Sequence, residues 1–251
     1  MAIAIIGGVA LNETVDGTTV TLTNFTISAA VGNYLVVAVS TECAAANTGP
    51  CTGVTYGGVA LTELANEVCY DSSFGAAASW WILANPTTGS ANVVATYQNT
   101  QTEQHIYAME ITGAPAGGAT ASLTSTLNDP NSTAGQITHL TDIATDGTLI
   151  LLCVADGSKF SRPYESYETN QTELYWSGGA SHTMAITYQT LNVGDTQPTS
   201  FETDNYRYAS AVIGFEPAGG APAGWGNKII GQSTGNINGI DRAGIAKVNG
   251  V

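Results

Sequence analysis

The sequence predicts an all-β fold, an antiparallel sandwich of two sheets with an extended C-terminal tail, and three observations support this prediction. Charged residues make up only 10% of the 251 residues, against ~25% in an average soluble domain, and 29 glycines are available for turns. Short apolar runs recur between turn residues, many of them alternating. No stretch combines a 3.6-residue amphipathic period with helix caps. Because 43% of the residues are hydrophobic, the chain can bury a substantial core.

Strands are predicted wherever an apolar run lies between turn signals. The runs NYLVVAVS and TLILLCVA are apolar on both faces, so each is predicted to lie mid-sheet with both faces covered. Gly57 and Gly58 separate two alternating runs and predict a two-residue hairpin turn, because glycine accepts a positive φ without steric cost. The apolar phase slips between Leu22 and Phe25, which predicts a β-bulge. The predicted strands cover residues 3–6, 19–27, 34–40, 54–56, 59–64, 79–84, 91–97, 105–112, 122–127, 136–141, 148–155, 172–176, 182–189 and 206–215.

The two halves of the chain resemble each other. VGNYLVVAVSTE is similar to TDGTLILLCVAD, and EQHIYAMEITGAP is similar to NYRYASAVIGFEP. A distant duplication explains this similarity, and so do two sheets of one sandwich built in the same way. Only the short stretch TGAPAGGAT (112–120) separates the halves, so one sandwich domain over residues 1–216 is the more economical prediction.

A spacer and a tail are predicted to follow this domain. Residues 217–228 are rich in glycine and proline and favour neither helix nor strand. The tail, 229–251, contains a short repeat in which INGI (237–240) recurs as VNGV (248–251). It is too short to bury its own apolar side chains, so we expect it to pack on another surface, either its own domain or a neighbouring subunit. The expected assembly contacts are Ile229, Ile230, Ile237, Ile240, Ile245, Val248 and Val251, with Arg242 and Lys247 meeting acidic neighbours.

The charge distribution limits the partners. The net charge is −14; residues 1–227 hold 19 acidic and three basic residues, whereas residues 228–251 hold one acidic and three basic. No basic surface is available to neutralise phosphates, so nucleic acid and anionic membranes are not expected as partners. The first residues, MAIAIIGGVALNETV, lack the basic start of a signal peptide and a long apolar run, which predicts synthesis in the cytosol and use without signal-dependent export.

No catalytic or metal site is predicted, and no cofactor. GQSTG (231–235) matches the G-x-S-x-G nucleophile motif but lacks the strand before it and the helix after it. His105, His139 and His182 lie near the ends of predicted strands, where solvated or core-edge histidines are expected, and the sequence anchors no trio of Ser or Cys, His and Asp. The Asp/Asn loops 127–135 and 202–206 can hold calcium, but the same residues form turns, which is the preferred interpretation.

Aromatic residues gather in two places. Trp80 and Trp81 are adjacent on a predicted strand, so one is expected in the core and the other outward or at an interface. For a second group of aromatic residues three roles stay open: a sugar-binding platform, a protein contact, or structural packing under a loop. This group comprises Phe160, Tyr164, Tyr167, Tyr175 and Trp176.

The cysteines suggest one bridge. Cys43 and Cys51 flank the short loop AAANTGP and could close it as a disulfide in oxidising surroundings. Cys153 lies in an apolar run and is predicted to be a buried thiol.

Several segments, in their order along the chain, resemble a family of β-sandwich proteins common among the virion components of tailed bacteriophages and related bacterial surface proteins. They are MAIAIIGG with TVTLTNFT, GNYLVVAVS, VTYGGVALTEL, ASWWILANPTTGSANVVATY and YASAVIGFEPAG, and the ending INGI with IAKVNGV is similar to short tails of phage structural proteins. The resemblance covers most of the chain. It implies a sandwich of jelly-roll type, no catalysis, and a role in building or decorating a particle.

The sequence therefore predicts a non-enzymatic virion structural protein: a capsid (head) decoration or fibre subunit, or a tail appendage. It would be made in the host cytoplasm and lie on the outer surface of the virion. Its expected partners are other virion proteins and copies of itself as a homo-oligomer, with a host-surface glycan as a further candidate. Two alternatives stay open: a carbohydrate-binding module of a surface protein, and a subunit of an extracellular filament in which MAIAIIGGVAL or the tail joins a neighbour's sheet.

Overall fold

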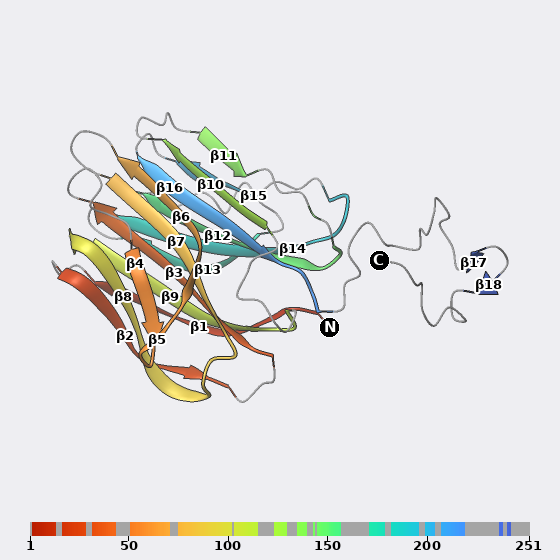
Figure 1. Ribbon diagram of the computed structural model, residues 1–251. Coiled ribbons are helices and arrows are strands. Elements are labelled where there is room, and N and C mark those ends of the chain that lie inside the picture. The colour runs from red at the N-terminus through yellow and green to blue at the C-terminus, as the bar shows by residue number, and fades with distance from the viewer. Residues whose placement is uncertain are drawn as a thin grey trace.

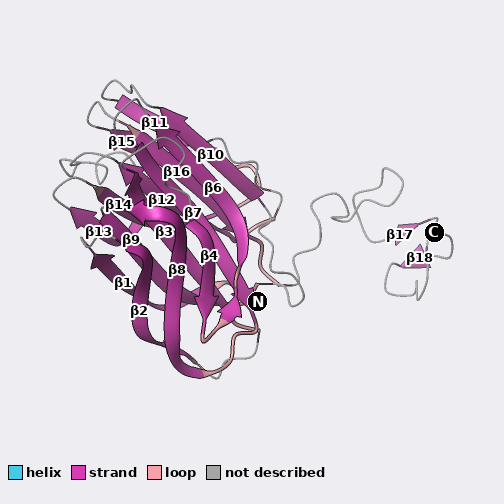
Figure 2. Ribbon diagram, turned by 60° about the vertical axis from the view of Figure 1, so that its left-hand side comes forward, coloured by secondary structure: helices cyan, strands magenta, loops and turns pink. Residues whose placement is uncertain are grey.

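The computed structural model of the chain is all-β, with antiparallel sheets and no helix among the described residues (Figures 1 and 2). The described ranges contain no long apolar helix that could cross a lipid bilayer. Part of the chain is described, and in some strands the structure describes the backbone but not the side chains. These residues are 12–13, 43, 123–125, 127–129, 135–138, 178, 199–203, 236–237 and 240–241. The structure describes residues 2–13, 17–28, 32–43, 51–70, 75–101, 103–114, 123–129, 135–139, 143, 145–156, 171–178, 182–195, 199–203, 207–218, 236–237 and 240–241.

The first half of the chain forms two sheets. Apolar side chains between them form one core, which includes Val37, Trp81 and Val93. Sheet A has the strand order β1 (Ala4–Glu13), β9 (Glu103–Thr112), β3 (Tyr34–Cys43), β7 (Gly75–Ala84) and β6 (Thr62–Tyr70). Sheet B has the order β2 (Gly17–Ile27), β8 (Gly89–Gln101), β4 (Cys51–Tyr56) and β5 (Val59–Ala60).

The second half forms two further sheets. His139 of β11 reaches Ser210 of β16 at 2.9 Å, so sheet D lies over the outer face of sheet C. Sheet C has the order β10 (Leu123–Asp129), β16 (Tyr208–Phe215), β12 (Thr148–Asp156), β14 (Thr183–Leu191) and β13 (Thr172–Gly178). Sheet D pairs β11 (Gly135–His139) with β15 (Thr199–Thr203), and in the tail β17 (Asn236–Ile237) pairs with β18 (Ile240–Asp241).

The two halves have the same topology. Strands β10, β16, β12, β14 and β13 occupy in sheet C the places of β1, β9, β3, β7 and β6 in sheet A, and β11–β15 corresponds to β2–β8. Among the described strands, β4 and β5 are an addition to the first half. The similarity between the halves of the sequence is thus a repeated unit, and the body has four sheets where the prediction had two. The all-β, antiparallel part of the prediction is confirmed.

Sheets A and C pack face to face between the outer sheets. Figure 1 shows these layers, with β2 and β8 on one side and β11 and β15 on the other. β6 contacts β10 while β1 contacts β13, so the strand order is reversed across the interface, as in an approximate twofold arrangement of the two units. Because sheets A and C are covered on both faces, β3 and β12 are buried over the whole length of their described side chains. This confirms the prediction that the runs NYLVVAVS and TLILLCVA lie mid-sheet with both faces covered.

Three local predictions can be checked directly. Gly57 and Gly58 form the predicted turn, with φ of 56° and 84°. The register shifts between Leu22 and Phe25, as predicted for a bulge. Trp80 and Trp81 do point to opposite faces, but both are buried, so the expected outward tryptophan is wrong; sheet A has no outward face at this point.

Candidate functional site

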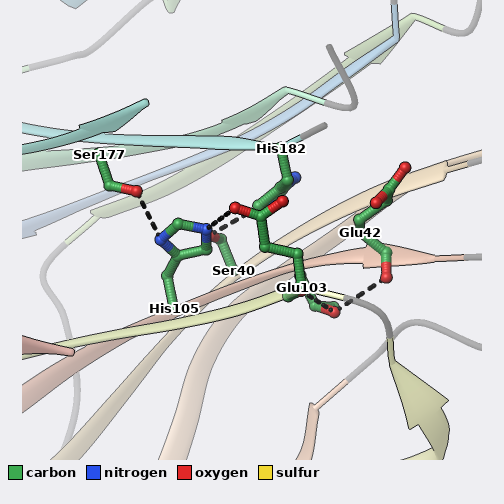
Figure 3. Close-up of polar contacts among 7 residues, drawn as sticks. Ser40, Glu42, Glu103, His105, Ser177 and His182 are labelled. Carbon is green, nitrogen blue, oxygen red and sulfur yellow. Dashed lines mark hydrogen bonds and ion pairs between the residues drawn. The ribbon is translucent and has the colours of Figure 1, made fainter. Parts of the chain in front are cut away.

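A cluster of polar side chains is buried at one end of the core between sheets A and C (Figure 3). We call Ser40, Glu103, His105, Ser177 and His182 the Ser–His cluster. The Oγ of Ser177 lies 2.8 Å from Nδ1 of His105, and the Oγ of Ser40 lies 3.0 Å from Nε2 of His182. The two imidazole rings are 5.0 Å apart, and Nε2 of His105 is 3.5 Å from Oε1 of Glu103. Each sheet thus contributes one serine and one histidine, and each serine pairs with the histidine of the other sheet.

Strand alternation explains why these residues meet. Ser40 and His105 are cross-strand partners on β3 and β9, and both continue the row of side chains that faces sheet C. Ser177 lies on β13 and His182 directly precedes β14, so both come from sheet C. In the second unit the pair equivalent to Ser40 and His105 is Ala155 and Ala209, by their place along the matching strands. At these equivalent positions, sheet A therefore carries a serine and a histidine, whereas sheet C carries two alanines.

Burial dominates the electrostatics of the histidines. All three are fully buried, so the expectation of solvated histidines is wrong, whereas the position of His105 and His182 at one end of the core fits the core-edge alternative. Burial holds the pKa of His182 well below its usual value, and repulsion from His105 lowers it further. Burial also lowers the pKa of His139 from 6.5 to about 4. His139 and His182 are thus neutral at neutral pH and act as hydrogen-bonding groups.

A buried carboxylate, that of Glu110, lies on the other face of sheet A. Burial alone would raise the pKa of Glu110, but hydrogen bonds from the backbone N–H of Ser28, the amide of Asn33 and the hydroxyl of Ser28 outweigh it, and the net effect lowers the pKa. The carboxylate ties the loop before β3 to β9.

The Ser–His cluster has the order of groups found in acyl-transfer enzymes, with Ser177, His105 and Glu103 in a row. Such chemistry requires a substrate to reach the nucleophile. Ser177 exposes only 7% of its surface and His105 none. In this geometry the two Ser–His pairs join the layers and fix the register of sheet A on sheet C. The sequence could not indicate which residues meet in this cluster, because its members are distant along the chain.

The predicted aromatic group is only partly described. Tyr175 and Trp176 lie on β13 and point to opposite faces of sheet C. Tyr175 stacks on Tyr107, with ring centroids 5.6 Å apart. Trp176 packs against a separate apolar cluster on the face of sheet C that points away from sheet A. These two side chains thus pack structurally and share no common face for a sugar. Phe160, Tyr164 and Tyr167 lie outside the described residues.

The cysteine predictions have different outcomes. Cys51 has a free thiol, which donates to the carbonyl of Gly53 at 3.4 Å, and burial raises its pKa to about 12. The predicted Cys43–Cys51 bridge is therefore not formed in this structure; the side chain of Cys43 lies outside the described residues. Cys153 is the buried thiol that was predicted.

The expected tail contacts are also largely undescribed. Ile237 and Ile240 pair through their backbones in β17 and β18. Ile229, Ile230, Arg242, Ile245, Lys247, Val248 and Val251 lie outside the described residues.

One edge of sheet A presents apolar side chains to solvent. β1 is the last strand of that sheet, and within the described chain it pairs only with β9. It carries no charged residue between Ala4 and Asn12. Ile6 is 41% exposed and Val9 is 47% exposed. Edge strands are commonly protected by charges or by cover, and within the described residues the protection seen on β1 is a bulge at Gly7.

The described part of the chain contains no group of three or more His, Cys, Asp or Glu side chains that could hold a metal ion. The calcium-type loops 127–135 and 202–206 are described only in part and without their acidic side chains. No family model, curated protein or solved structure matches this chain.

Proposed function

We propose that this chain is a non-enzymatic structural subunit of a tailed-phage virion that assembles with copies of itself and with other virion proteins. A head decoration, a fibre subunit and a tail appendage all fit this role. The stacked layers are compatible with a pair of jelly-roll-type sandwiches fused in one chain. The virion assignment rests on the sequence resemblance described above.

The observation that carries the assembly function is the edge strand β1, whose exposed side chains are apolar. A strand at a sheet edge offers unpaired N–H and C=O groups to another chain, and the exposed Ile6 and Val9 add apolar area beside them. The net charge of −14 keeps such a surface soluble before assembly. The same edge would serve the filament alternative, since strand addition is also how many filament subunits join.

We predict that charge on β1 weakens self-association. The double substitution Ile6→Lys and Val9→Lys should raise the dissociation constant of the oligomer by about tenfold or more, because two lysines must then be desolvated at the contact. Size-exclusion chromatography with light scattering over a concentration series measures this. The matched control is Val59→Lys with Thr62→Lys, at two exposed residues on β5 and β6, away from β1. Equal association of both variants and the parent would contradict the role of β1.

Removal of residues 228–251 should give a folded chain that no longer joins the assembly. Every core described above lies within residues 1–216, so circular dichroism and the midpoint of thermal unfolding should be nearly unchanged. Association is measured as for the β1 variants. Immunogold labelling of phage particles from cells that carry the gene tests the virion assignment; labelled free filaments would instead support the filament alternative.

We predict that Ser177 is not a reactive nucleophile. A fluorophosphonate probe should label the parent no more than Ser177→Ala, because Ser177 is buried and His105 is inaccessible. Intact-protein mass spectrometry reports the label. Stoichiometric labelling that disappears in Ser177→Ala would contradict the non-enzymatic assignment.

A further inference from the structure

A hollow of about 390 Å³ opens beside β1, on the side of the A–C core where β1 and β13 are the free edges. We call it the β1 hollow. Apolar side chains from both layers line it, Ile3 and Ile5 beside β9 Tyr107, with Leu149, Leu174 and Tyr188 from sheet C, although its accessible surface is more polar than apolar. Gly8 keeps it open on the β1 side, because a Cβ at this position would collide with the hydroxyl of Tyr107.

The C-terminal segment leaves the body close to this hollow. The backbone N–H of Ala218 donates to the carbonyl of Gly113 at 2.6 Å. Gly113 in turn packs against Ala2, so closely that a Cβ would collide with its carbonyl. Ala2 directly precedes the first residue that lines the hollow. The chain that continues from residue 219 to residue 251 therefore starts at the mouth of the β1 hollow.

Acidic residues near the β1 hollow favour the binding of a basic segment there. Asp146 and Asp195 are exposed in the turns next to Leu149 and Thr190, which line the hollow, and Glu216 is partly exposed before the exit. Residues 228–251 carry three basic residues and one acidic residue, in contrast to the acidic body. Two bodies that approach each other repel, and a basic segment that crosses to the neighbour reduces this repulsion.

We propose that the β1 hollow receives segment 229–251 of a neighbouring copy, whose isoleucine and valine side chains fill it. This inference rests on the proposed function, since it names the receptor for the tail in the assembly. The two exposed side chains of β1 offer far less area than the ~1,000 Å² that a stable interface needs. A segment that wraps onto a neighbour supplies the missing area, and reciprocal exchange between two copies doubles it.

Photo-crosslinking of the full chain tests the proposal. p-Benzoylphenylalanine replaces Ile240, and equal amounts of unlabelled chain and ¹⁵N-labelled chain are mixed before irradiation. We expect crosslinked peptides that join one labelled and one unlabelled chain, with the partner site at Ile3, Ile5, Tyr107 or Leu174. Crosslinks confined to one chain, or joining Ile240 to other surfaces, would overturn the proposal.

A matched pair of variants adds specificity. Thr190 is exposed and lines the β1 hollow on the face of β14 that carries Tyr188, so Thr190→Arg should place bulk and charge in it without disturbing a core. The control is Val59→Arg, at an exposed residue in a separate hollow by the β4–β5 hairpin. We expect Thr190→Arg to reduce crosslinks between copies about tenfold and Val59→Arg to leave them unchanged. Equal crosslinking in both variants would overturn the proposal.

Light scattering on the same samples separates this inference from the proposed function. Oligomers without crosslinks in the hollow would leave the assembly function standing and exclude the hollow as the receptor. A chain that is monomeric at all concentrations, with crosslinks only within one copy, would contradict both.

Discussion

Substitution of Trp80 by alanine is expected to lower the free energy of unfolding by about 3–5 kcal/mol, the cost of truncating a large aromatic in a packed core. Trp80 is fully buried in the core that joins sheets A and C. Its indole N–H donates to the carbonyl of Ala211, at 2.9 Å, on β16 of the other unit. The side chain therefore contributes both apolar area and a hydrogen bond to the contact between the two units. Urea denaturation followed by far-UV circular dichroism measures the effect.

Two further variants separate these contributions. Trp80→Phe keeps most of the apolar area but removes the N–H donor, so we expect a smaller loss of about 1–3 kcal/mol. Trp81→Ala acts on the core between sheets A and B and should cost as much as Trp80→Ala. If the first unit unfolds separately from the second, only Trp80→Ala should weaken both transitions. A loss below about 1 kcal/mol for Trp80→Ala would contradict the layered arrangement, because a tryptophan on an open face would behave in that way.

The alternation of apolar and polar residues along the chain was sufficient to predict most strands, but it did not indicate to which sheet each strand belongs. The run 59–64 was predicted as one strand, yet the chain passes at Leu61 from β5 in sheet B to β6 in sheet A. Periodicity is a local property and does not indicate which partner a strand finds. The burial of Trp81 has the same origin, since only the presence of sheet B decides whether that face is covered.

The repeat could have been recognised from the sequence more firmly than it was. Gly32 and Gly147 both have φ above +70° and both precede the central strand of a sheet. An alignment on these glycines brings Tyr34, Val36 and Ala38 onto Leu149, Leu151 and Cys153, which all face the shared core. What the sequence could not show is that the two units pack through these faces, because that depends on shape across the whole sheet.

The Ser–His cluster was missed for a related reason. Ser40 and His182 are 142 residues apart, and Ser177 and His105 are 72 apart. A usable signal did exist: Ser40 ends a run that is apolar on both faces, and a polar residue there must find a buried partner. The sequence offered no means of choosing which histidine would supply it.

Acid is expected to destabilise the fold, starting near pH 6.5. In the unfolded chain a histidine binds a proton near that pH, whereas burial keeps His139 neutral until about pH 4. Between these values the unfolded state binds more protons than the folded state, so the free energy of unfolding falls as the pH falls. His182 acts in the same direction, since its pKa is also lowered. Glu110 adds to the loss at lower pH, because its pKa is lowered and its protonation removes the hydrogen-bonded carboxylate.

The substitution His139→Gln isolates the contribution of one group. At ~1.4 kcal/mol per pKa unit, the shift from 6.5 to about 4 corresponds to about 3 kcal/mol lost by pH 4. We expect the parent to lose about that much more stability than His139→Gln between pH 8 and pH 4, although the variant starts lower because its bond to Ser210 is altered. Every other residue is the same in both proteins, so contributions from elsewhere in the chain cancel in the comparison. Urea denaturation at pH 8, 6.5, 5 and 4 gives the two profiles. Parallel profiles would mean that His139 is protonated in the folded chain and is therefore not sealed between sheets C and D.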